Sequence, residues 1–237
     1  NSFNVSRTFS WPPKDLTTQW WSKAIENTGV REALKWSFAA GIAAAGLALV
    51  LGTCIAFAVS KYSFFGRETI SLLVVLPISL PGIVTGIALN NAFTQTLGIG
   101  TSAFTIIVGH ATFCIVIVYN NAIARLKRLG TSLQEASMDL GANGFTTFRL
   151  ITLPNISSAL FAGGLLAFGL SFDEIVVTTF TAGPGIQTLP VWIFNNLFRP
   201  NQAPIVNVVA ATLIVISILP IYLSQRLSAD TSSGGRF

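Results

Sequence analysis

Charged residues are scarce in this chain, with 14 Lys and Arg and 9 Asp and Glu among 237 residues, or 10%. A soluble domain usually carries about a quarter charged residues. Because 51% of the residues are hydrophobic, so few charges could hardly cover the surface of a water-soluble domain of this size. The composition excludes a disordered chain and indicates an integral membrane protein.

Cysteine is rarer still, with two residues, and the common catalytic motifs are absent. Cys54 and Cys114 lie inside apolar segments, which favours small buried side chains over a disulfide or a metal pair. The chain has no GxxxxGK(S/T) phosphate loop, no HExxH pair and no nucleophile elbow. We therefore expect a protein that is not itself an enzyme and that binds no cofactor of its own.

Long apolar runs account for most of the chain. A helix needs about 20 mostly apolar residues to cross the hydrocarbon core of a bilayer. Five segments meet this length, at residues 33–59, 70–93, 103–124, 156–181 and 205–223. The alternating ten-residue segments of a membrane barrel are absent, so the sequence predicts an all-α integral membrane protein.

Lys and Arg are distributed unevenly between the connections. If the chain crosses the membrane at each of these segments in turn, the connections on one side of the membrane hold eight basic residues: Lys61, Arg67, Arg125, Lys127, Arg128, Arg149, Arg226 and Arg236. The short connections of the other side hold only Arg199. The positive-inside rule places the first side in the cytoplasm, which predicts a multi-pass protein of a bacterial cytoplasmic membrane. The basic residues lie between apolar runs and not on one polar face, so we expect no nucleic-acid partner.

This pattern divides the chain into three parts: residues 1–32, a membrane domain over 33–226, and a cytoplasmic tail over 227–237. The first part is polar and is predicted to lie outside, with a helix from an N-cap at Asp15 to a stop at Gly29. Its helical stripe would consist of Trp20, Trp21, Ala24 and Ile25. Such a stripe fits either a helix at the outer headgroup boundary or a packed segment outside the membrane.

Three features inside the predicted spans bear on packing. Small residues recur on one face of the first span, at Gly41, Ala45, Ala48 and Gly52, and favour a close helix–helix contact. Pro77 and Pro81 predict a kink in the second span. His110, in the third span, is predicted to be a structural histidine bonded to a neighbouring helix.

The connection between the third and fourth spans, within residues 125–155, is too long and too patterned for a simple link. Ser132 with Glu135, or Thr131 with Gln134, would form a capping box that begins a helix, and Gly141 would end that helix.

Asn143 would cap a second short helix, on which Phe145 and Phe148 expose aromatic rings beside Arg149. Exposed aromatic side chains beside a basic residue favour a protein partner. A self-contained lid is the alternative.

The run Glu135-Ala136-Ser137, with Gly141, Ile151 and Leu153-Pro154 at their spacings, resembles the EAA signature of permease subunits of binding-protein-dependent ABC importers. Ser137 stands where the signature usually has Ala. The resemblance implies the MetI-like helix bundle of a type I importer, whose loop docks into a groove of a cytoplasmic ATPase. The implied coupling residues are Glu135, Ala136, Gly141, Ala142, Asn143, Gly144, Phe145, Phe148, Leu153 and Pro154.

The runs SFNVSR and LSFDEIVVTTFTAGPGIQTLP look like those of permeases of spermidine/putrescine importers. In that group such a start follows a membrane helix, so the resemblance implies a sixth span before Asn1. It also implies two ATP-binding subunits that hold ATP and Mg, a second homologous permease and an extracytoplasmic substrate-binding protein. Importers of ferric iron or amino-acid derivatives have related sequences, and a stand-alone channel or secondary transporter is a more distant alternative.

Asp173 and Glu174 are the only acidic residues within a predicted span. A carboxylate at the bilayer centre costs about 2.5 to 3.5 kcal/mol on insertion scales, so it should face water or a partner. Neighbouring residues on a helix diverge by about 100°, so the two carboxylates should point different ways. They would either attract a cationic substrate along the pathway or form an internal contact that holds helices together. Residues 183–204 should form an outer loop with a short helix.

Overall fold

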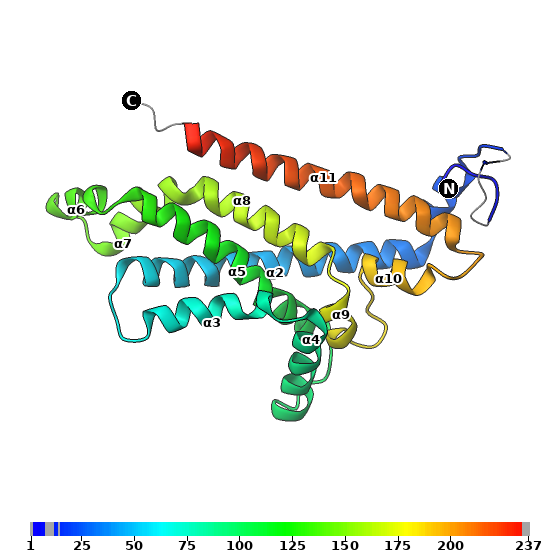
Figure 1. Cartoon of the computed structure of the whole chain (residues 1–237), viewed down its shortest axis with the longest axis horizontal. Helices are drawn as coiled ribbons and strands as arrows, with labels where there is room; N and C mark the ends of the chain where they lie inside the picture. The colour runs from blue at the N-terminus through cyan, green and yellow to red at the C-terminus, as the bar shows by residue number, and fades with distance from the viewer. Residues whose placement is uncertain (1, 8–11, 14, 234–237) are drawn as a thin grey trace.

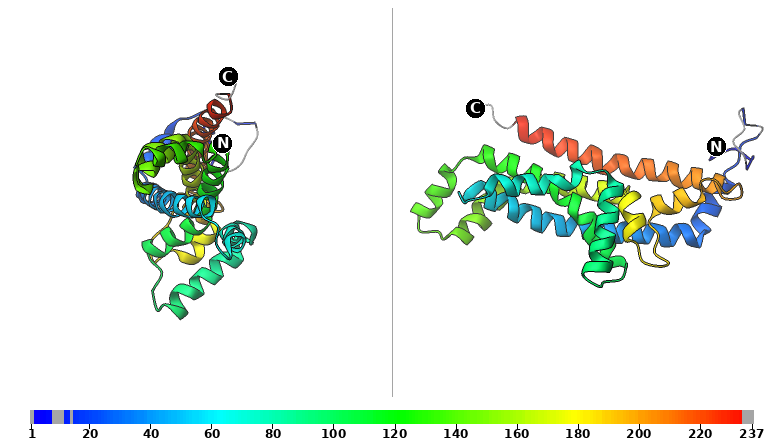
Figure 2. Two further views of the ribbon diagram at one scale, coloured as in Figure 1. Left: turned by 90° about the vertical axis from the view of Figure 1, so that its left-hand side faces the viewer. Right: turned by 60° about the horizontal axis from the view of Figure 1, so that its bottom comes forward.

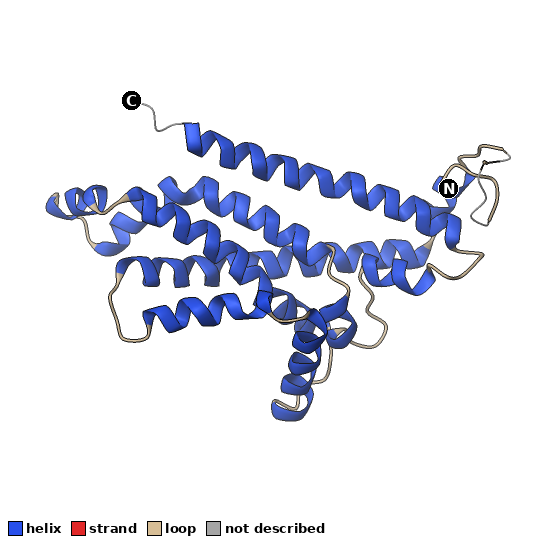
Figure 3. Cartoon of the chain, viewed as in Figure 1, coloured by secondary structure: helices blue, strands red, loops and turns tan. Residues whose placement is uncertain are grey.

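The structure is a computed structural model that describes residues 2–7, 12–13 and 15–233. Within these ranges helices joined by loops make up the chain, as Figure 3 shows, and one isolated bridge joins Asn4 to Leu16. The long helices α2 (Thr28–Lys61), α5 (Ala103–Leu129), α8 (Leu153–Phe172) and α11 (Ala203–Ser233) run along the long axis of the molecule (Figure 1). The predicted all-α class is confirmed.

Helix α2 lies at the centre of the bundle, against α5 and α8. The predicted stripe of small residues is buried in this contact. A Cβ atom on Gly41 would lie 3.0 Å from the ring of Phe168, and one on Gly52 would lie 3.0 Å from Cβ of Val118. Glycine therefore allows α8 and α5 to approach the backbone of α2, as the spacing predicted.

The second predicted span is two helices instead of one kinked helix. Helix α3 (Arg67–Ser79) ends before Leu80, and α4 (Gly82–Asn91) continues into the short π-helix η1 (Ala92–Thr96). The two parts are bent by 107°, so that α4 projects from the bundle (Figures 1 and 2). Leu80 precedes Pro81 and is extended, with ψ 147°, because the proline ring disfavours a helical conformation at the residue before it.

The fourth predicted span is also divided. Helix α8 ends at Phe172, and a six-residue helix, α9 (Val176–Thr181), follows after a non-helical step at 173–175. The expectation that Asp173 lies within a helix is therefore wrong. We call residues 173–175 the α8–α9 break.

The N-terminal helix is shorter than predicted. Helix α1 (Gln19–Glu26) begins after Thr18 and not at Asp15, and α2 already begins at Thr28. The early start of α2 has a local cause, because Oδ1 of Asn27 accepts a hydrogen bond from the amide of Val30 at 3.1 Å.

The predicted stripe of α1 is divided between core and surface. Trp20 and Ala24 are buried in a cluster with α2, α10 (Leu189–Asn196) and α11, whereas Ile25 is 72% exposed. Helix α10 is the short helix expected in the outer loop.

Among the described residues, three helices are long and apolar enough to cross a membrane, and the bent pair of α3 and α4 adds a fourth if it is one span. The first part of α11, Ala203–Ile216, is apolar but shorter. The count of five spans stays a prediction. Helix α11 continues to Ser233, through most of the predicted tail, and residues 234–237 lie outside the described residues.

Candidate functional site

The loop between α5 and α8 holds two short helices, α6 (Ser132–Asp139) and α7 (Gly144–Thr147), at one end of the bundle (Figure 1). We call residues 130–152 the α6–α7 loop. The predicted capping box is wrong, because no side chain caps α6. Thr131 has helical dihedrals in place of the extended conformation that presents a capping hydroxyl. Its carbonyl oxygen instead accepts the amides of Gln134 and Glu135, each at 2.9 Å.

Gly141 forms the turn between α6 and α7. Its φ of +86° is a left-handed conformation that side chains disfavour. The amide of Gly141 donates to the carbonyl of Met138 at 2.9 Å, and the amide of Ala142 donates to that of Ser137 at 3.1 Å. The predicted helix stop is therefore confirmed. The hydroxyls of Ser137 and Thr147, 3.1 Å apart, join α6 to α7.

Asn143 caps α7 as predicted, because its Oδ1 accepts the amide of Thr146 at 2.8 Å. Phe145 is 73% exposed. The expectation that Phe148 is exposed is wrong. The residue is half-buried, and its ring packs edge-on against Phe57 of α2, with 4.9 Å between the ring centroids. The short π-helix η2 (Phe148–Thr152) starts at this residue and changes which way the following side chains point around the helix axis. The signature residues Glu135 and Ala136 are exposed on α6.

The loop continues into the bundle without a break in helical conformation. Thr147, Thr152 and Leu153 all have helical dihedrals, and Pro154 lies in the first turn of α8, where a missing amide is tolerated. The residues Gly144–Phe172 form one helix of 29 residues. At 1.5 Å per residue, its 29 residues extend for about 43 Å. This rod connects the α6–α7 loop to the α8–α9 break.

The two acids at the far end of the rod differ in their contacts. Glu174 uses Oε1 to accept the amide of Val177 at 2.8 Å, which caps α9. Asp173 is exposed, and its carboxylate forms no hydrogen bond or ion pair with any residue that the structure describes. The two carboxylates therefore differ in their contacts, although the helical geometry on which that expectation rested is absent at 173–175. Glu174 forms an internal contact, whereas Asp173 remains available.

His110 of α5 connects the two sides of the break. It is completely buried, with Nδ1 2.7 Å from Oγ of Ser171 and Nε2 2.8 Å from Oγ1 of Thr178. The Thr178 hydroxyl donates to the carbonyl of Glu174 at 2.9 Å, so Nε2 must carry the proton that Thr178 accepts. In the neutral imidazole, Nδ1 then accepts from Ser171. The prediction of a structural histidine bonded to a neighbouring helix is confirmed.

The other end of α9 is held by residues that sequence reasoning missed. Thr105 donates its hydroxyl to the carbonyl of Thr181 at 2.7 Å. Asn90 of α4 donates its side-chain amide to the carbonyl of Phe180 at 2.6 Å. Their partners are backbone carbonyls 76 and 90 residues away along the chain, so no local pattern could have indicated them.

Cys54 and Cys114 differ in their burial. Cys114 is buried as predicted, whereas Cys54 is exposed on α2, which corrects its expected burial. In the described part of the chain, no three His, Cys, Asp or Glu side chains come together as a metal site.

Residues 48–232 match a family described as binding-protein-dependent transport system inner membrane component. The match includes α3 through α10, the C-terminal part of α2 and nearly all of α11. The chain therefore belongs to this family: it is a permease subunit of an ABC importer and a multi-pass membrane protein.

Its relatives include polyamine permeases. The chain is 34% identical to the spermidine/putrescine transport system permease protein PotC of Escherichia coli K12 over 234 residues, 99% of this chain and 88% of that one. It is 32% identical to the putrescine transport system permease protein PotI of the same strain, over 95% of this chain and 83% of the relative.

An inward-facing structure of the MetNI methionine ABC transporter shares the fold, with a TM-score of 0.68 and 17% identity. The likeness includes 90% of this chain and 99% of that one. The predicted MetI-like fold is thereby confirmed.

Proposed function

We propose that this permease carries a polyamine, such as spermidine or putrescine, into a bacterial cell across the inner membrane. Two separate cytoplasmic subunits would bind ATP and Mg, and a second homologous permease would complete the pathway. A substrate-binding protein would deliver the polyamine at the outer face, near α10. The similarity to PotC and PotI supports this substrate class.

The observation that carries the coupling part of the proposal is the continuous helix Gly144–Phe172. Phe145 projects at the start of this helix, 73% exposed, and would enter a groove of the ATPase. A rigid helix moves as a unit, so a displacement of the loop reaches the α8–α9 break without being absorbed by an intervening hinge. Rigid-body motion of two permeases would then alternate access to the pathway.

Asp173 is the residue we assign to the substrate pathway. A polyamine loses hydration as it enters a membrane protein, and a nearby carboxylate offsets that cost. The carboxylate of Glu174 already accepts the amide of Val177, so it contributes less. A single unpaired carboxylate suits transport because it attracts the cation without holding it tightly.

Uptake of labelled spermidine by the reconstituted complex, with its binding protein, tests this proposal. Asp173→Asn should lower uptake about tenfold, equivalent to about 1.4 kcal/mol in the barrier, while ATPase binding persists. Asp15→Asn, the same chemical change outside the break, is the matched control.

Unchanged uptake in Asp173→Asn would remove this residue from the pathway. Uptake of ferric ion or an amino-acid derivative in preference to polyamines would contradict the substrate class. Uptake that needs no ATPase would contradict the importer mechanism.

A further inference from the structure

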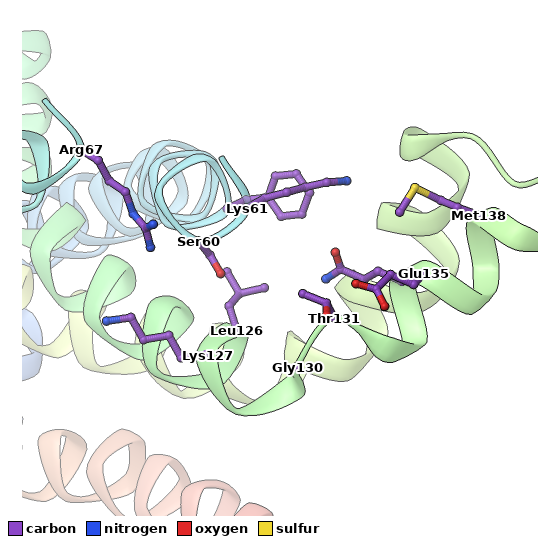
Figure 4. A pocket seen from close by; sticks show the side chains of 11 residues that line it. Ser60, Lys61, Arg67, Leu126, Lys127, Gly130, Thr131, Glu135 and Met138 are labelled. Carbon is purple, nitrogen blue, oxygen red and sulfur yellow. The ribbon is translucent and has the colours of Figure 1, made fainter. Parts of the chain in front are cut away.

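A pocket of about 380 Å³ lies where the ends of α2, α3 and α5 meet α6. Figure 4 shows the side chains around it. Its polar lining includes the cations Lys61, Arg67 and Lys127, together with Ser60, Thr131 and Glu135. The three cations come from three different helices, so the tertiary structure brings them together.

The pocket holds more positive than negative charge, with three cations against one carboxylate. No ion pair joins any of the three to a carboxylate within the described ranges. Lys61 places its ammonium 5.4 Å from the ring centre of Phe57. Arg67 and Lys127 reach toward one side of the pocket, whereas Lys61 extends toward α6 (Figure 4). An anion in the pocket would gain favourable Coulomb energy from these cations.

The chemistry of the lining favours a phosphate group. A guanidinium donates paired hydrogen bonds to phosphate oxygens, and an ammonium adds a point charge. The hydroxyls of Ser60 and Thr131 also line the pocket and can donate to the remaining oxygens.

The surroundings indicate where the phosphate comes from. The turn between α2 and α3 exposes Tyr62, Phe64 and Phe65, the last of them fully, and α3 has no buried residue. Aromatic side chains beside basic ones are typical of the membrane–water interface. The pocket lies at the Lys- and Arg-rich end of the bundle, where basic pockets between membrane helices bind lipid headgroups.

We propose that this pocket binds the phosphodiester headgroup of an anionic phospholipid of the cytoplasmic leaflet. The hydroxyl of Thr131 belongs to the α6–α7 loop, whereas Arg67 and Lys127 belong to the bundle. A bound headgroup therefore bridges the loop and the bundle and stabilises their relative position. This site is separate from the substrate pathway and goes beyond the proposed function.

The test uses the transporter complex in phosphatidylcholine nanodiscs with a small fraction of spin-labelled phosphatidylglycerol or spin-labelled phosphatidylcholine. The immobilised fraction of each label measures lipid preference. A charge-assisted hydrogen bond to a phosphate oxygen contributes about tenfold in affinity. We therefore expect Arg67→Gln and Lys127→Gln each to lower the preference for phosphatidylglycerol about tenfold. Arg128→Gln, next to Lys127 but outside the pocket lining, should leave it unchanged.

Three results would overturn the proposal. An equal loss in Arg128→Gln would show diffuse attraction in place of a site. Release of the labelled lipid by millimolar inorganic phosphate would identify a free anion as the ligand. Loss of the ATPase subunit from the pocket variants, with lipid preference intact, would identify a protein contact. Because the readout is lipid immobilisation, it does not depend on uptake. Arg67→Lys, which keeps the charge but loses the paired hydrogen bonds, should retain part of the preference.

Discussion

The α6–α7 loop and the α8–α9 break lie at opposite ends of one helical rod, but different kinds of contact hold them. In the loop, the cap joins Asn143 to Thr146, three residues apart, and Phe145 stays exposed. In the break, buried His110 bonds to Thr178, 68 residues away. Contacts close in sequence leave the loop surface free for a partner. Contacts distant in sequence hold the break in place from several helices at once.

The two regions should therefore respond differently to substitution. Changes on the exposed surface of the loop should affect binding of a partner and leave the stability of the bundle almost unaltered. Changes in the break should lower stability first, because they leave buried polar groups without partners.

The largest effect is expected for His110→Ala. It removes hydrogen bonds to Ser171 and Thr178 and leaves a cavity, so the free energy of unfolding should fall by about 3 kcal/mol. Thermal unfolding of the complex in detergent measures this loss. Thr112→Ala, which removes only a local bond to the carbonyl of Gly109, is the control on the same helix. A loss no larger than that of the control would show that His110 does not hold the break.

Phe145→Ala should weaken ATPase binding by about 2 kcal/mol, as for a central aromatic residue of an interface, and leave the melting temperature unchanged. Phe148→Ala should do the opposite, because Phe148 packs on Phe57 inside the protein. Pull-down of the ATPase subunit and thermal unfolding, measured on both variants, give the comparison. Equal effects of the two variants on ATPase binding would show that exposed Phe145 and packed Phe148 do not have separate roles.

Gly141→Ala should strain the turn at φ +86° by about 1 to 2 kcal/mol. The loop would then populate other conformations, and ATPase affinity should fall roughly five- to 30-fold. Gly169→Ala, in α8, places its Cβ in open space and is the control. Titration of the ATPase subunit against the reconstituted permease measures both. Undiminished affinity in Gly141→Ala would mean that this turn does not position the docking segment.

The smallest effect is expected for Asn143→Ala, which removes the cap of α7 at a cost of about 1 kcal/mol. Amide exchange over residues 144–147 should become about fivefold faster, and Asn143→Ser, which retains a capping oxygen, should restore most of the protection. Exchange in the break, measured in the same experiment, should not change. Faster exchange in both regions would show that they are not independent.

Much of the loop could be predicted because its determinants are short-range. The stop at Gly141 and the cap at Asn143 depend on residues within a few positions of each other, and the structure bears out both. The capping box failed because Thr131 adopts helical dihedrals, which the identity of the residue does not determine. The burial of Phe148 depends on α2 and could not follow from the pattern of the loop alone.

Amino-acid composition and spacing by themselves determined that this is a helical membrane protein, where its apolar segments lie, and which loop bears the family signature. Hydrophobicity, charge distribution and backbone preferences belong to single residues and their near neighbours, so they can be read along the chain. Only the tertiary structure decided that α8 ends at Phe172, that His110 spans the break, and that three cations share one pocket. Those features depend on helices distant in sequence, and their partners are set by packing.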